Sequence, residues 1–372
     1  MVSGITALVA AAAFIAGQTP AALSAGHEVT IVRGRAFVPV WLDGVGPYPF
    51  LVDTAAPYVA LDAPIAATLG LPSVGEPEQI GGFTAQRVRV QALEVAGRPA
   101  IGCGAYAAGL APMESVYGLR VAGILGLPGL PERFLLDCEG GRIARYPLEM
   151  GPEWIAVPMT TGPGGVMRVP VTLNGAHAVE AELDTAFSGT LALPQDLLEQ
   201  WGLFTEHTPR LRVADGDGVR GATQIRLPEC TVGPLEVVTP LCEVLEEHAA
   251  PRLGMRFYTR FALALDRAAG TLHLRPLVPV PWHDPPVHSA GVTPAEQVED
   301  LWSLFVAEDS PAQRAGLVSG DLLVSVNGMD MAGQSFDYAH RALTGQPATV
   351  LDIAVLRGGE ALAVTVAIGE SL

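Results

Sequence analysis

The sequence predicts a mainly β fold, with two similar β lobes followed by a smaller module that mixes helices and strands. Three observations predict it. A motif-bearing segment returns 131 residues later in the chain, from Val38 to Val169, and prolines crowd the region 276–294. Glycine and proline contribute 42 and 31 of the 372 residues, and 49% of residues are apolar against 16% charged. That composition is typical of a turn-rich protein with a large apolar core.

The basic residues exclude several kinds of chemistry. All 22 are arginines, so the chain has no lysine. A P-loop, a pyridoxal Schiff base and a Ser–Lys hydrolase site each require a lysine, which excludes these three mechanisms. The formal net charge of −17 argues against a protein that follows a phosphate backbone, and we expect no nucleic-acid partner.

Residues 1–25 are predicted to be a signal peptide. Ile5–Gly17 is an apolar run of about 13 residues, shorter than the roughly 20 that span a bilayer, and small residues follow it to a candidate cleavage site near Ala25. No basic side chain precedes the run, so a buried first strand or helix is the alternative. We expect an exported protein, periplasmic or extracellular, with no integral membrane span after signal removal.

Four cysteines are present, and none of them forms a Cys-x-x-Cys pair: Cys103, Cys138, Cys230 and Cys242. No zinc or redox motif can be built from this spacing, and we expect no metal and no cofactor. Two states remain open for Cys230 and Cys242. They can form a local disulfide across a turn at Gly233-Pro234, or stay free as small apolar side chains in the core.

The repeated segment divides most of the chain into two halves, residues 26–150 and 151–276. Val38–Gly44 returns as Val169–Gly175, and the same spacing carries Asp53-Thr54-Ala55 onto Asp184-Thr185-Ala186. Further landmarks follow in the same order, among them a Leu-Gly pair that ends at Gly126 in the first half and at Gly254 in the second. We interpret this order as an internal duplication.

Each half is predicted to be rich in strands. The repeated apolar runs end in Asp-Gly and Asn-Gly, which favour tight hairpins. Short helices are expected at Pro64–Leu69 and Gln195–Trp201, and late hairpins within Phe134–Arg145 and Phe261–Leu274. Two equal β lobes packed about a pseudo-twofold axis would bring the two Asp-Thr segments together on that axis.

A pair of aspartates on such an axis can do chemistry. Two carboxylates about 3 Å apart share one proton, because both cannot ionise at once. The charged member can take a proton from a water molecule while the protonated member donates to a carbonyl oxygen. The hydroxyls of Thr54 and Thr185 can bond across the axis and hold the carboxylates in place. The alternative is ordinary turn chemistry, in which each Asp-Thr caps the end of a strand.

The two loops resemble those of a known family. Leu51–Ala56 and Glu182–Phe187 resemble the Asp-Thr-Gly loops of aspartic proteases, most closely the retropepsin-like type of bacteria, and Ile124–Gly126 resembles the hydrophobic-hydrophobic-glycine motif that follows such a loop. The resemblance implies two pseudo-symmetric acid-protease β-barrel lobes and a polypeptide substrate. It implies Asp53 and Asp184 as the catalytic pair. The supporting loop residues would be Thr54, Ala55, Thr185, Ala186, Gly126 and Gly254.

The same resemblance implies flaps and exposes two departures from the family pattern. The flaps would be carried by Gly81, Gly82 and Phe83 in the first lobe and by Asp215 and Gly216 in the second. Alanine replaces glycine at the third loop position in both lobes, at a cost of about 1 kcal/mol if the backbone there needs positive φ. Arg252 stands where a hydrophobic residue is expected, and could alter the loop or reach a carboxylate. A catalytically weak or inactive peptide-binding scaffold is therefore the alternative function.

The last part of the chain is expected to be a separate module. Residues 277–289 form a Pro-rich linker, and residues 290–372 follow it. Ser310–Leu317 and Ser319–Leu323 resemble the core of a bacterial-type PDZ domain. The resemblance implies that a peptide or protein C-terminus binds there by adding a strand to a sheet edge. The best candidate for the loop that captures the terminal carboxylate is Leu301–Phe305.

Overall fold

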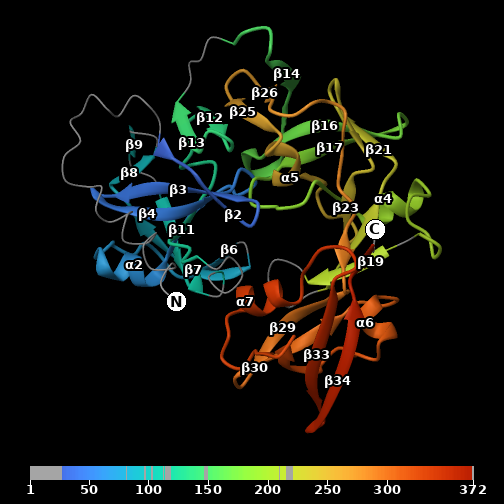
Figure 1. The fold of residues 1–372 in the computed structure, drawn as a ribbon. Helices are drawn as coiled ribbons and strands as arrows, with labels where there is room; N and C mark the ends of the chain where they lie inside the picture. The colour runs from blue at the N-terminus through green and yellow to red at the C-terminus, as the bar shows by residue number, and fades with distance from the viewer. Residues whose placement is uncertain are drawn as a thin grey trace.

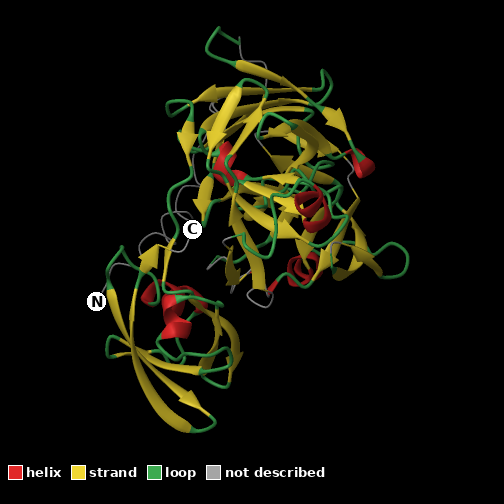
Figure 2. Cartoon of the chain, turned by 90° about the vertical axis from the view of Figure 1, so that its right-hand side faces the viewer, coloured by secondary structure: helices red, strands yellow, loops and turns green. Residues whose placement is uncertain are grey.

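The computed structural model describes residues 27–80, 82–95, 98–101, 104–111, 113, 119–145, 150–208, 210–214 and 221–370. The predicted signal peptide, Cys103, Gly81, Asp215 and Gly216 lie outside these ranges. Strands dominate, which confirms the mainly β class (Figure 2). Each lobe has one large sheet, a further sheet is shared by both lobes, and the C-terminal module has its own (Figure 1). No helix in the described ranges is long and apolar enough to cross a membrane.

The first lobe is built on one long sheet. Its strands, in spatial order, are β6 (Glu78–Ile80), β7 (Phe83–Arg89), β10 (Gly104–Ala108), β5 (Val59–Asp62), β11 (Gly123–Leu125), β4 (Val45–Val52), β3 (Arg35–Leu42), β8 (Ala92–Val95) and β9 (Arg98–Ile101), with β2 (Thr30–Val32) also on β3. Helix α2 (Ala63–Thr68) follows β5. The β3–β4 hairpin turns at Asp43 and Gly44, whose φ angles are 49° and 81°. Asp-Gly favours such a turn because both central residues need positive φ.

The second lobe has a sheet of the same kind. Its strands, in spatial order, are β19 (Arg210–Ala214), β20 (Gly221–Arg226), β23 (Leu241–Leu245), β18 (Leu191–Pro194), β24 (Arg252–Leu253), β17 (His177–Leu183), β16 (Met167–Leu173), β21 (Glu229–Val232), β22 (Leu235–Val238) and β27 (Trp282–His283), with β15 (Thr160–Thr161) also on β16. The helical segments are η2 (Pro163–Gly165), α4 (Gln195–Gln200) and α5 (Met255–Tyr258). Buried and half-buried residues alternate along β16, as expected for a strand with one face on the core.

The central strands of the two lobes follow one pattern. In the first lobe β11 runs parallel to β4 and antiparallel to β5. In the second lobe β24 runs parallel to β17 and antiparallel to β18. The Asp-Thr segments follow β4 and β17 directly, so both leave their sheets at equivalent places.

A third sheet joins the lobes. Its strands, in spatial order, are β1 (His27–Glu28), β13 (Arg142–Arg145), β12 (Arg133–Asp137), β25 (Phe261–Asp266), β26 (Thr271–Pro276) and β14 (Ile155–Pro158). Strand β12 of the first lobe pairs antiparallel with β25 of the second along five residue pairs, from Arg133 opposite Asp266 to Asp137 opposite Ala262. Every residue of β25 is buried. One apolar core therefore runs through both lobes.

The cysteines of the second lobe are free thiols. Cys230 and Cys242 are both buried and unpaired as disulfides, so the second of the two open states holds. The β21–β22 hairpin does turn at Gly233-Pro234, but its register places Val237 opposite Cys230. Burial raises the pKa of the Cys230 thiol to about 12, which makes it a poor nucleophile.

The Pro-rich segment 277–289 is extended, and it is packed against the second lobe. Trp282 in β27 is 6% exposed. Its ring centroid lies 5.4 Å from that of Phe257 and 5.6 Å from that of Phe261. Because burying a tryptophan against two aromatic rings stabilises the segment, this stretch acts as an ordered strap along the lobe.

Asp284 fastens the strap by hydrogen bonds. Its side chain is buried, and its Oδ2 accepts from Thr190 Oγ1 at 2.5 Å and from Leu241 N at 2.9 Å. Thr190 immediately precedes β18, which follows the loop of Asp184. The strap therefore supports one flank of that loop.

We expect Asp284→Ala to lower the free energy of unfolding by about 2–3 kcal/mol, because it leaves a buried hydroxyl and a buried N–H without an acceptor. Asp284→Asn keeps one oxygen for the position of Oδ2 and should cost less than the alanine variant. Thermal and urea unfolding of the full chain measure both. An alanine variant as stable as the parent protein would contradict the anchoring role.

The C-terminal module has a separate core. Its sheet contains, in spatial order, β29 (Val292–Val298), β30 (Leu301–Val306), β31 (Leu322–Val326), β33 (Val350–Arg357) and β34 (Glu360–Ala367), with β32 (Met329–Asp330) on β31. Strand β28 (His288–Ser289) pairs with β35 (Gly369–Glu370), and the helices are α6 (Pro311–Arg314) and α7 (Phe336–Ala342). Ser310 and Ser335 cap the two helices, their hydroxyls accepting from backbone N–H groups.

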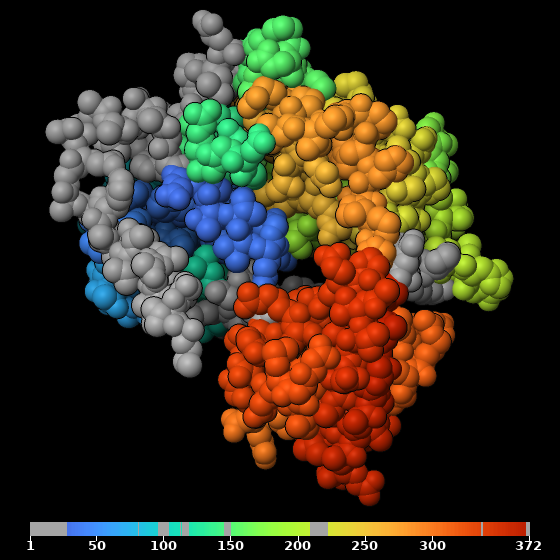
Figure 3. Space-filling model, in the orientation of Figure 1, coloured from blue at the N-terminus to red at the C-terminus, as the bar shows by residue number. Residues whose placement is uncertain are grey.

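The expected carboxylate-capturing loop at Leu301–Phe305 is wrong, because this stretch is the inner strand β30. It pairs with β29 on one side and β31 on the other, and its residues alternate between half-buried and buried. The edge strands are β29 and β34; α7 lies next to β29, and β19 of the second lobe also lies close to β29. In the space-filling view the module sits below the two lobes (Figure 3).

Candidate active site

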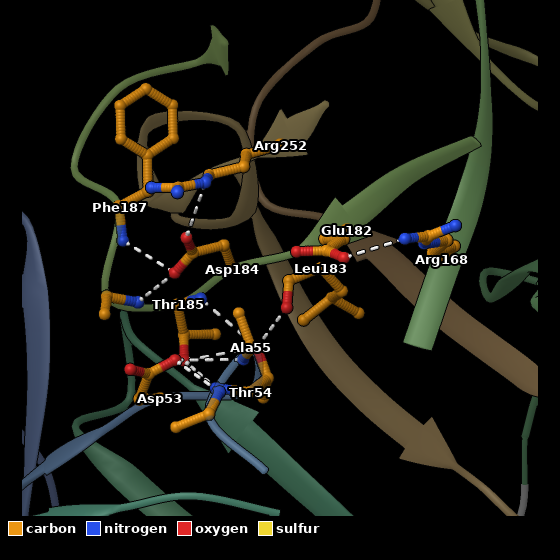
Figure 4. Close-up of polar contacts among 12 residues, drawn as sticks. Asp53, Thr54, Ala55, Arg168, Glu182, Leu183, Asp184, Thr185, Phe187 and Arg252 are labelled. Atoms are coloured by element: carbon orange, nitrogen blue, oxygen red, sulfur yellow. Dashed lines mark hydrogen bonds and ion pairs between the residues drawn. The ribbon is translucent and has the colours of Figure 1, made fainter. Parts of the chain in front are cut away.

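Two aspartates stand where the central strands of the lobes end, and Figure 4 shows their loops face to face. Asp53 follows β4, and its backbone N–H donates to Leu125 O of β11 at 3.1 Å. Asp184 follows β17, and its N–H donates to Leu253 O of β24 at 3.0 Å. Each aspartate is thus fixed by the same bond to the strand that runs parallel to its own.

Each aspartate holds its own loop in shape. Oδ1 of Asp53 accepts from the N–H groups of Ala55 at 2.9 Å and Ala56 at 3.0 Å. Oδ1 of Asp184 accepts from those of Ala186 and Phe187, both at 2.9 Å. In each carboxyl group this leaves Oδ2 outside the loop's own hydrogen bonds.

Reciprocal threonine bonds tie the two loops together. Thr54 Oγ1 donates to Leu183 O at 2.5 Å and accepts from Thr185 N at 3.1 Å. Thr185 Oγ1 donates to Val52 O at 2.7 Å and accepts from Thr54 N at 3.1 Å. Both threonines are fully buried, so these bonds are shielded from water. They hold the two aspartates in a fixed relation, each loop anchored to the other lobe (Figure 4).

The loop glycines allow a close approach of backbone. A Cβ on Gly126 would lie 1.9 Å from Tyr58 O, and one on Gly254 would lie 2.5 Å from Gly189 O. The bond from Leu127 N to Ala56 O at 2.9 Å lies beside the first of these contacts. Gly126 and Gly254 thus support the loops by letting the following chain pack directly beneath them.

The alanines at the third loop position are not strained. Ala55 and Ala186 are absent from the non-glycine residues of the described chain that have left-handed φ angles. Glycine's special freedom is therefore not needed at either position, and the cost considered from the sequence does not arise. Both alanine N–H groups make the loop bond to their aspartate, so the departure from the family pattern leaves the loop geometry intact.

The pKa values of both carboxyl groups are raised, and the neighbouring charges that act on them differ. Burial, followed by the negative charge of Asp184, raises the pKa of Asp53 to about 7. Burial also raises the pKa of Asp184, while the positive charge of Arg252 opposes the rise. Interacting groups of this kind titrate as one pair. Over a range of acidic to neutral pH the pair can hold one proton.

Arg252 reaches the site, one of the two outcomes expected from its place in the sequence. Its Nε lies 3.9 Å from Asp184 Oδ2, with the arginine side chain 44% exposed and the aspartate side chain 7% exposed. Phe187 and Arg252 lie on the same side of Asp184 in Figure 4.

The segment expected to be the first-lobe flap is a hairpin above an apolar cluster. Strands β6 and β7 pair from Glu78 opposite Ala85 to Ile80 opposite Phe83, and Gly82 at the turn has a φ of 85°. Ile80 and Phe83 pack on a cluster that also contains Ala56 and, from the second loop, Ala186. In the second lobe, β19 and β20 form the corresponding hairpin, whose turn lies outside the described residues.

Two further residues join the site without a signal in the sequence pattern. Arg35 Nε donates to Ala186 O at 2.8 Å, which connects β3 of the first lobe to the second loop. Tyr58 lies near Asp53, and burial, followed by that carboxylate, raises the pKa of its phenol. Arg35 could not be found from the repeat, because its counterpart position holds Val166. Within the described ranges, no group of three or more His, Cys, Asp or Glu side chains is placed to bind a metal.

Two β lobes that each contribute one Asp-Thr loop, locked by reciprocal threonine bonds, define an aspartic-protease type of site. Residues 38–128 match the family model described as aspartyl protease, and residues 306–357 match the model described as PDZ domain. Residues 38–128 are thus similar to aspartyl proteases, and residues 306–357 are similar to PDZ domains.

Comparison with solved structures gives a retropepsin-like aspartic protease from Rickettsia conorii, at 19% identity and a TM-score of 0.27. The match covers 32% of this chain and 89% of that one. No curated protein gives a significant match.

Proposed function

We propose that the protein is an aspartic endopeptidase that hydrolyses peptide bonds with the Asp53–Asp184 pair and an activated water molecule. The observation that carries this proposal is the reciprocal bonding of Thr54 and Thr185, which holds two half-buried to buried carboxyl groups together in one site. The lobe sequence that matches the aspartyl protease model contains the first of the two loops.

The pair can supply both proton transfers of hydrolysis. Water attacks the peptide carbonyl carbon and gives a proton to the ionised carboxyl group, while the protonated carboxyl group gives its proton to the carbonyl oxygen. The resulting tetrahedral intermediate carries two hydroxyls. It collapses when the first carboxyl group passes its proton to the amide nitrogen and the second takes a hydroxyl proton, so the C–N bond breaks and the pair returns to its starting state.

The pH range of hydrolysis follows from the titration of Asp53 and Asp184. Because the pKa of Asp53 is about 7, activity should fall as the pH rises through that value and the last shared proton is lost. It should fall again at low pH, where Asp184 also takes a proton. The profile is therefore bell-shaped with its basic limb near neutral pH.

The assay uses the full chain and a reduced, denatured protein as substrate, at pH 3–7. A peptide inhibitor with a hydroxyl-bearing tetrahedral carbon, which mimics the intermediate, is the probe for the site. We expect cleavage that the inhibitor abolishes. Absence of cleavage together with tight binding of the inhibitor would instead support the second candidate, a scaffold that grips peptides without turnover. Arg252, which occupies the neighbourhood of Asp184, is the observation that favours this scaffold.

The PDZ domain extends the proposal to substrate recruitment. Its edge strand β29 ends in the exposed residues Glu296–Val298, and a peptide C-terminus could add to this edge as a further strand. The predicted signal peptide would place the activity outside the cytoplasm, on exported polypeptides.

A further inference from the structure

The two halves of the site differ at one equivalent position. In the first lobe Ile124 of β11 stands opposite Leu51, two residues before Asp53. In the second lobe Arg252 of β24 stands opposite Glu182, two residues before Asp184. Ile124 is buried in the apolar cluster beneath the flap, whereas Arg252 is half-exposed and reaches the carboxyl group.

The charges around Asp184 leave Arg252 as the decisive cation. Glu182, the nearest further acid on its own strand, is held by Arg168 at 3.0 Å, so its charge is locally balanced. Tyr258 on α5 is fully buried, and burial raises the pKa of its phenol so far that it stays neutral. Asp53 faces Asp184 from the other lobe.

Arg252 acts less on Asp53. Its charge also lowers the pKa of Asp53, but it is the last of the causes there, whereas for Asp184 it is the largest cause that opposes burial. In the described part of the chain no ion pair joins Asp53 to a cation, and its other titratable neighbour, Tyr58, is also held neutral by burial. Arg252 therefore lies closer to one member of an otherwise matched pair of loops. Since an opposite charge within about 4–6 Å favours the ionised form, the two carboxyl groups cannot be equivalent.

We infer that Arg252 is a positioning residue that keeps the negative charge of the pair on Asp184 and thereby places the shared proton on Asp53. Asp184 is then the member that takes a proton from water, and Asp53 is the member that donates to the carbonyl oxygen. These roles in hydrolysis rest on the function proposed above, whereas the location of the proton does not.

The first test reads the proton directly, in full-length protein labelled with ¹³C at the aspartate carboxyl carbons. In the Asp53→Asn background the NMR titration of Asp184 is free of coupling to its partner. Adding Arg252→Ile, which installs the residue found in the first lobe, should raise the pKa of Asp184 by about one unit. In the Asp184→Asn background the same substitution should raise the pKa of Asp53 by clearly less. An unchanged pKa of Asp184, or an equal shift in the pKa values of both aspartates, overturns the inference.

Three matched variants separate charge from packing. Arg252→Lys keeps the positive charge and should keep the pKa of Asp184 close to that of the parent background. Arg252→Gln replaces the charged side chain with a neutral polar one, and it takes the place of Arg252→Ile in the titration if the isoleucine variant does not fold. Arg120→Leu removes a similar pair, Arg120 Nη2 to the buried Asp62 at 3.5 Å, from elsewhere in the first lobe and should not move Asp184.

The second test is the pH profile of hydrolysis. Without Arg252 the ionised state of Asp184 is less stable, so the acidic limb of kcat/KM should move upward by about one pH unit. If the parent protein hydrolyses peptide and the acidic limb of the Arg252→Gln profile lies at the same pH as that of the parent, the inference fails and the proposed function stands. If the parent protein shows no hydrolysis, the proposed function fails while the NMR titration still decides the location of the proton.

Discussion

Asp53→Asn and Asp184→Asn should each lower kcat for peptide hydrolysis by about 10³–10⁴-fold, because either change removes one of the two proton transfers. An asparagine at either position can still accept the two loop N–H bonds that the aspartate Oδ1 accepts, so the loop keeps its shape. The measurement is steady-state hydrolysis of a fluorogenic peptide at pH 5. Undiminished turnover by either variant would refute the two-aspartate mechanism.

Folding of these variants can be checked independently. The pKa of Asp53 is about 7 in the folded protein, against 3.8 for an unperturbed aspartate. The protonated carboxyl group therefore adds to the free energy of unfolding in full below pH 3.8, and this contribution is lost as the pH rises through about 7. Asp53→Asn cannot ionise and escapes that loss, and should therefore unfold at pH 7 at a temperature no lower than the parent protein. Asp137→Asn is the matched control, since Asp137 is a buried aspartate of the shared sheet and its loss should leave kcat unchanged.

Thr54→Val should lower the free energy of unfolding by about 2–3 kcal/mol and reduce kcat together with it. Valine fills the same space, but the hydroxyl that donates to Leu183 O and accepts from Thr185 N is gone. Both of those groups are buried, so water cannot replace the lost partner. Urea unfolding and the peptide assay measure the two effects.

Thr54→Ser is the control, because it retains the hydroxyl and loses only a methyl group. The serine variant should recover most of the stability and most of kcat. The double variant Thr54→Val, Thr185→Val should cost less than twice the single change, since the two hydroxyls share bonds across the interface. Independent, fully additive costs would argue against the reciprocal lock.

The repeated pattern explains why the centre of the site could be predicted from the sequence. Asp53 and Asp184 each directly follow the second strand of a hairpin, and equivalent strands in two equal lobes present the residues after them at equivalent places. The hydroxyls of Thr54 and Thr185 follow from the same symmetry. The short helices also lie within one residue of their predicted bounds, because each follows an apolar strand and has a proline at or next to its first residue.

The remaining features depend on contacts between distant segments. Arg35 reaches the second loop only because the lobes pack as they do, and Asp284 bonds to Thr190 across 94 positions of chain. The prolines around Trp282 pointed to an extended segment, and they carry no information on whether it packs. Leu301–Val306 is apolar at every position except Ser303, a short apolar run that is consistent with a buried strand and less so with a loop.

The pairing of β12 with β25 has a further consequence. It joins the two lobes within one polypeptide, so assembly of the site is a folding event and does not depend on an encounter between molecules. Dilution should leave the activity per molecule unchanged. A site made from two identical chains must carry the same residue at both equivalent positions. Here each half can change alone, which is how isoleucine and arginine come to occupy equivalent positions in the two lobes.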